Sequence, residues 1–144
     1  MNFASILRRL LSPNSRPRPS SDRARLGARG ETVAARYLRR CGHRIINRNY
    51  RCPLGEIDLI TTDGDTIVFV EVKTRSDDTH ADPQESIGAA KRSRLERAAK
   101  HFLASHRSGD FSCRFDVVSI VWRPGESPRI DHLPDAFEPR NPWV

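Results

Sequence analysis

Two short, mostly apolar segments hold acidic and basic side chains in a pattern that could bind a metal ion. Asp58 lies in GEIDLI, and Glu71 and Lys73 lie two residues apart in VFVEVKTR. Buried strands rarely hold charges unless these are paired or used. Carboxylates gathered at a partly buried site repel one another, and a hard divalent cation such as Mg²⁺ relieves this repulsion. A nearby lysine can orient a water molecule and stabilise charge on a phosphate.

These side chains meet only if the two segments form a hairpin in a suitable register. The turn sequence Asp63-Gly64 predicts strands over 56–61 and 66–73, with Asp58 diagonal to Glu71 at about 7–8 Å between alpha carbons. Because side chains alternate along a strand, Asp58, Glu71 and Lys73 should share one face. A salt-bridge cluster, in which Glu71 and Lys73 neutralise each other at a sheet edge, is the structural alternative.

The elements around the hairpin follow from the apolar periodicity and the turn residues. The order is helix, three strands, helix and strand, and both hairpin faces are apolar, which predicts an α/β domain with a mixed central sheet flanked by helices. Gly42 is well placed to cap the first helix. The expected elements are a helix over 31–41, a strand over 43–51, the two hairpin strands, a long helix from Ile87 through Leu103, a strand over 114–122, and one short strand near 129–133.

Most of the net positive charge lies in an N-terminal tail. Residues 1–25 hold six arginines against Asp22, whereas residues 26–144 are close to balanced. The Pro- and Ser-rich stretch 12–21 predicts a disordered linker. Apolar residues within 3–11 recur at helical spacing, which leaves open a short amphipathic helix and a membrane-associated role. We therefore divide the chain into a tail, 1–25, and a single domain, 26–144.

Composition excludes several classes of protein. The chain has 144 residues, enough for one domain with its own core. Its three cysteines have no metal-ligand spacing and favour a reducing compartment over a disulfide framework. No apolar run is long enough for a signal peptide or a membrane span, so we expect a soluble, cytoplasmic protein without stable membrane insertion.

Several motifs together resemble a known family. The motifs are GARGETVAARYL, NRNY, GEIDLI, VFVEVKTR, KRSRLERAAKHFL and RFDVV. They resemble the YraN-like family of uncharacterised bacterial proteins, predicted to be endonucleases, over residues 27 to about 137. Within the wider PD-(D/E)xK superfamily, the chain is similar to archaeal Holliday-junction resolvases, although Ile57 replaces the proline of the motif.

The resemblance implies a restriction-endonuclease-like three-layer fold and a role for each site residue. It implies that Asp58 and Glu71 bind Mg²⁺ or Mn²⁺, that Lys73 is the catalytic lysine and that Glu31 is an accessory carboxylate. The backbone carbonyl of Val72 would complete the metal ligands. Glu31 also stands at a helix start, where the macrodipole alone favours an acid. Glu56 shares the hairpin face and is a reserve candidate.

The expected activity is hydrolysis of phosphodiester bonds in nucleic acid, and the expected substrates include branched or structured DNA. Basic residues flank the acidic site, which suits phosphates approaching a cation. No base-reading motif is present, so recognition by shape is expected. A noncatalytic nucleic-acid-binding or adaptor module is the alternative, and the choice between DNA and RNA and the formation of a homodimer stay open. The candidate phosphate contacts are Arg36, Arg48, Arg51, Arg75, Lys91 and Arg94.

Overall fold

The computed structural model describes residues 22–76, 87–106 and 112–140. The predicted α/β order is confirmed, with a fifth strand longer than expected. The linker, the segment 3–11 and most of the loop before the second helix lie outside the described residues. In chain order the elements are α2 (Asp22–Arg40), β1 (Arg44–Cys52), β2 (Gly55–Asp63), β3 (Thr66–Arg75), α3 (Ala89–Ser105), β4 (Ser112–Val121) and β5 (Arg129–Phe137).

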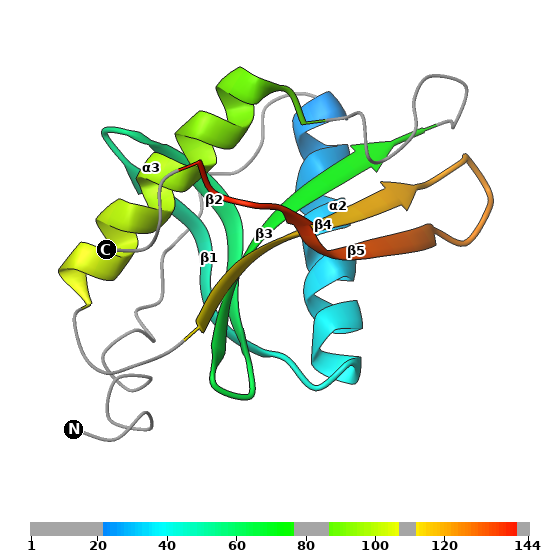
Figure 1. Cartoon of the computed structure of the whole chain (residues 1–144). Coiled ribbons are helices and arrows are strands. Elements are labelled where there is room, and N and C mark those ends of the chain that lie inside the picture. The colour runs from blue at the N-terminus through cyan, green and yellow to red at the C-terminus, as the bar shows by residue number, and fades with distance from the viewer. Residues whose placement is uncertain (1–21, 77–86, 107–111, 141–144) are drawn as a thin grey trace.

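The five strands form one mixed sheet in the order β1-β2-β3-β4-β5. β3 and β4 are parallel, and the other neighbouring strands are antiparallel. The two helices cover opposite faces of the sheet (Figure 1), which gives the three layers expected from the sequence. Neither described helix is long and apolar enough to cross a membrane.

Helix α2 covers one face of the sheet and ends at a glycine cap. Ala34 and Leu38 are fully buried against this face, whereas Cys41, just beyond the last helical residue, is exposed. Gly42 has a φ of 93°, and its N–H donates to the carbonyl of Arg39 at 3.0 Å. This arrangement satisfies the last carbonyls of the helix and confirms the predicted cap. The helix begins at Asp22, not at residue 31, so it includes residues 22–25, which the sequence analysis placed in the tail.

The hairpin turn lies one residue later than predicted. Asp63 pairs with Thr66, so Gly64 and Asp65 form the loop, and Gly64 supplies the positive φ, 58°, at its first position. The register predicted from an Asp63-Gly64 loop was therefore wrong by two residues. A shift of two leaves the faces of the paired residues unchanged, because the period of a strand is two.

The two faces of β3 contact different helices. Val68 and Val70 pack in the cluster that includes α2, whereas Phe69 packs against Phe102 of α3. Glu71 alternates in phase with Phe69, so it faces the α3 side of the sheet. The apolar pattern of the hairpin therefore places the acidic residues between the sheet and α3.

Candidate active site

The candidate site lies where β2 and β3 stop pairing. Their ladder ends at Leu59 opposite Val70. Beyond this pair β2 continues along β1 as far as Gly55, and β3 continues along β4 as far as Arg75. The two strands therefore diverge at the next step, which holds Asp58 on β2 and Glu71 on β3.

Local backbone changes accompany this divergence. Ile57 packs in the apolar cluster on the α3 side of the sheet, and Leu59 packs in the cluster on the α2 side. Residues two positions apart in a regular strand would share a face. On the neighbouring strand β1, Asn49 has a φ of 53°. The strand therefore twists at Asp58. The Asp58 carboxylate bonds to the free end of the ladder, because its Oδ2 accepts from the Val72 N–H at 2.8 Å.

The two carboxylates lie close together in a poorly solvated place. Glu71 is 6% exposed, and Asp58 is partly buried. Burial raises the pKa of Asp58 well above its ordinary value, and the neighbouring charges of Glu71 and, to a smaller extent, Glu31 raise it further. The hydrogen bond from Val72 acts in the opposite direction. The site thus concentrates negative charge that a cation would relieve.

Two lysines from different elements adjoin these carboxylates. Lys91, in the first turn of α3, forms an ion pair with Glu71. Burial and the nearby Lys91 ammonium lower the pKa of Lys73, although Glu71 acts to raise it.

Asp58, Glu71 and Lys91 line a cleft of about 400 Å³ between strands β2 and β3 and helix α3, whereas Lys73 is not among the residues that line it. Gly55 allows the close approach of β2 and α3, because a β-carbon there would lie 3.1 Å from the backbone oxygen of Arg94. The cleft is lined by Gly55, Glu56, Asp58, Glu71, Lys91, Arg94 and Leu95. It therefore holds two basic residues of α3 opposite three carboxylates of the sheet.

The accessory carboxylate and the end of β3 are held together by a tight helix–strand contact. Gly30 of α2 lies so close to Thr74 that a β-carbon would meet the threonine Oγ1 at 1.9 Å. Glu31 follows Gly30, and its charge influences Asp58 as described above. Val72 contributes its N–H to Asp58, while its side chain packs on the α2 side.

The predicted phosphate contacts do not form one continuous group with the cleft. Lys91 and Arg94 line it, and Arg51 lies beside it, with Nε 3.7 Å from Oε1 of Glu56. Arg75 lies at the end of β3 and contributes to the lowered pKa of Lys73. Arg36 is exposed on α2, and Arg48 donates to Thr32 of the same helix at 3.1 Å. The α3 residues and Arg51 are therefore best placed to meet a substrate at the cleft.

The donor types suit a hard cation with water in its shell. Within residues 22–76, 87–106 and 112–140, no three His, Cys, Asp or Glu side chains are arranged to hold a metal ion. Mg²⁺ commonly uses one or two carboxylates and keeps several waters, so Asp58 and Glu71 fit this mode of binding.

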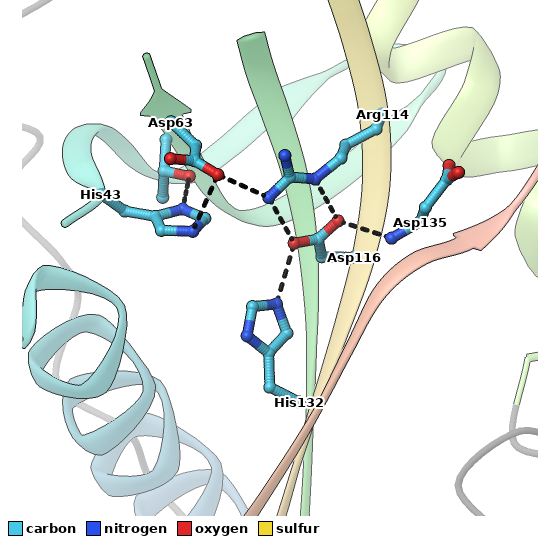
Figure 2. Close-up of polar contacts among 7 residues, drawn as sticks. His43, Asp63, Arg114, Asp116, His132 and Asp135 are labelled. Atoms are coloured by element: carbon cyan, nitrogen blue, oxygen red, sulfur yellow. Dashed lines mark hydrogen bonds and ion pairs between the residues drawn. The ribbon is translucent and has the colours of Figure 1, made fainter. Parts of the chain in front are cut away.

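A second polar cluster, which sequence reasoning missed, lies on the other face of the sheet (Figure 2). The Asp116 side chain is 0% exposed and accepts from Arg114 Nε at 2.9 Å and from His132 Nε2 at 2.8 Å. Arg114 also donates to Asp63 at 3.1 Å, and His43 lies 3.9 Å from Asp63. Asp116 alternates in phase with residues that pack under α2, so this cluster and the cleft are separate. An acid within the apolar run RFDVVSIV was its sequence signal.

Comparisons with known proteins agree on one family. Residues 30–120 match the model described as "Uncharacterised protein family UPF0102". A UPF0102 protein of Geobacter metallireducens is 46% identical over 113 residues, which is 78% of this chain and 92% of that protein. One from Moorella thermoacetica is 52% identical over 98 residues, 68% of this chain and 82% of the relative. One from Nocardia farcinica is 47% identical over 116 residues, 81% and 91% of the two chains. Their names state no activity.

Proposed function

Since the chain belongs to the uncharacterised protein family UPF0102, the YraN family that its motifs resemble, we propose its activity from the site itself: a Mg²⁺- or Mn²⁺-dependent endonuclease. It would hydrolyse phosphodiester bonds of nucleic acid, with structured DNA as the favoured substrate. The observation that carries the proposal is the pair of close carboxylates, Asp58 and Glu71, in a cleft that also holds lysine and arginine.

Each residue has a role that its position supports. Asp58 and Glu71, with the carbonyl of Val72, would hold the metal ion, and Glu31 would add negative charge beside them. A divalent cation bound there supplies Lewis-acid stabilisation of charge on the reacting phosphate. Lys73, two residues beyond Glu71 on β3, would orient the attacking water. Arg94 lines the cleft and would contact a substrate phosphate.

One observation favours a second candidate, a noncatalytic nucleic-acid-binding module. Glu71 is paired with Lys91, and such a pair can persist as a salt bridge without any metal. On this hypothesis the basic residues around the cleft would bind phosphates without cleaving them. Binding would weaken steeply with salt, and about four phosphate contacts would give a logarithmic slope near −3.6 on duplex DNA.

A single set of assays separates the two candidates. Purified full-length protein is incubated with duplexes, flaps, four-way junctions and single strands, in Mg²⁺, Mn²⁺ or EDTA. The variants are Asp58→Asn and Lys73→Ala, with Asp131→Asn as a control because this aspartate is 53% exposed on β5. We expect metal-dependent cleavage that both site variants lose and the control keeps. Cleavage that survives Asp58→Asn and Lys73→Ala would reveal a contaminant, and salt-sensitive binding without cleavage would favour the second candidate.

A further inference from the structure

The ion pair between Lys91 and Glu71 brings a residue of α3 into contact with a proposed metal ligand. The resemblance to the YraN-like family implies no such role for α3. The Glu71 side chain is 7% exposed and the Lys91 side chain 38%. A buried carboxylate needs a compensating charge or hydrogen bonds, and Lys91 supplies the charge. The lysine reaches the site across a long gap in the sequence, from a helix on the other side of the cleft.

The local position of Lys91 is unfavourable for the helix itself. Lys91 lies in the first turn of α3, which has no acidic residue and no side-chain cap. A positive charge near a helix N-terminus opposes the macrodipole, at a cost of about 0.3–1 kcal/mol. Arg92, its neighbour, turns away and donates to the carbonyl of Ile87 at 3.1 Å. The contact with Glu71 therefore explains the presence of Lys91 better than helix stability does.

A lysine and a divalent cation would compete for the same carboxylate. Asp58 and Glu71 carry two negative charges when ionised, and a divalent cation alone balances them. Lys91 and a metal ion would both need the oxygens of Glu71, so the two positive charges would repel each other at this poorly solvated carboxylate. The half-exposed lysine has a flexible four-carbon stem, so it can leave Glu71 while α3 stays folded.

We propose that Lys91 is a positioning residue that neutralises Glu71 in the metal-free protein, gives way to the divalent cation, and then faces the substrate phosphates beside Arg94. The inference rests on the proposed metal-dependent function. Lys91 and Arg94 are three residues apart on one helix and line the same cleft, so both can address one stretch of phosphate backbone. Lys91 would thus become available to contact phosphates only when the divalent cation is bound.

The test measures metal affinity as well as cleavage. Mn²⁺ is titrated into full-length wild type, Lys91→Gln and Lys91→Met at constant ionic strength, and free Mn²⁺ is followed by electron paramagnetic resonance. Glutamine retains a hydrogen-bond donor for Glu71 without the charge, so this variant is expected to fold if the methionine variant does not. Lys100→Gln is the matched control, because it removes the same charge from a half-buried lysine of α3 nine residues further on.

We expect Lys91→Gln to bind Mn²⁺ about tenfold more tightly than wild type, because a competing cation has been removed. The same variant should bind and cleave nucleic acid less well, and Lys100→Gln should leave the Mn²⁺ affinity unchanged. A gain in metal affinity together with a loss of nucleic-acid affinity is a result that a merely structural lysine would not give. If wild type binds Mn²⁺ and Lys91→Gln binds it no more tightly, the inference is wrong while the metal site stands. If none of the variants binds Mn²⁺, the proposed function and the inference both fail.

Discussion

Replacing Asp116 by alanine should destabilise the protein substantially without touching the cleft. The aspartate accepts from Arg114, His132 and the backbone N–H of Asp135, the last at 3.0 Å. Removing one partner of a buried ion pair costs about 3–5 kcal/mol, because the other charge is left uncompensated. Arg114 would keep Asp63 and is 22% exposed, so we expect a value near the lower end, about 3 kcal/mol. For a domain of this size the melting temperature should fall by roughly 10 °C.

The assay is urea denaturation at pH 7 for wild type, Asp116→Ala, Asp116→Asn and the double variant Asp116→Ala/Arg114→Met. Asparagine keeps the shape and an acceptor, so it should cost less than alanine. The double variant should cost less than the sum of its single changes, because neither member of the Asp116–Arg114 pair is left without the other. Asp131→Ala is the control, since this exposed aspartate lies 3.6 Å from Arg129 and should change stability by no more than about 1 kcal/mol. If Asp116→Ala costs no more than Asp131→Ala, the cluster does not stabilise the fold.

Three further outcomes follow from the geometry. Gly30→Ala should lower the free energy of unfolding by about 1–3 kcal/mol in urea, because the added methyl would overlap Thr74. Burial lowers the pKa of His43 below 6.5, so the unfolded state binds more protons than the folded state near that pH. The free energy of unfolding of the wild type should therefore fall as pH decreases through 6.5. In the His43→Gln variant, the plot of this free energy against pH should be flatter over the same range. The double variant Glu71→Leu/Lys91→Leu should be at least as stable as wild type by thermal denaturation, because apolar residues commonly replace buried ion pairs without loss, yet it should lose Mn²⁺ binding.

The sequence predicts correctly which face of the sheet carries Asp58 and Glu71, even though the predicted hairpin register is wrong. The hairpin register was wrong by two residues, but Asp58 and Glu71 kept their predicted faces because only an odd shift exchanges the faces of a strand. Alternation in VFVEV therefore carried more information than the position of the turn. The positions of Asp58 and Glu71 also depend on where the pairing of β2 with β3 ends, which is at Leu59 and Val70. The composition of the strands does not reveal that end point.

Other features were missed because distant contacts decide them. Gly27 and Gly30 lower helix propensity, which moved the predicted start of α2 to residue 31. In the fold Gly30 is needed for the contact with Thr74, so tertiary packing overrides propensity there. Lys91 was predicted only as a phosphate contact, because its distance from Glu71 depends on how α3 crosses the sheet. The Asp116 cluster draws on β2, β4, β5 and the residue after the α2 cap, a convergence that no local pattern encodes.

The two polar clusters differ in how completely the protein balances its own charges. Asp116 is fully buried, and fixed donors from three residues surround it, so its pKa lies below the ordinary value of 3.8 even though burial acts to raise it. Asp58 and Glu71 instead lie beside each other, and the pKa of Asp58 is raised by burial and by that like charge. A cluster that serves stability is expected to resemble the first, with each charge satisfied. In the cleft, the two carboxylates Asp58 and Glu71 repel each other, and Lys91, which pairs with Glu71, is half exposed. This repulsion destabilises the folded state, and binding of an external cation would relieve it.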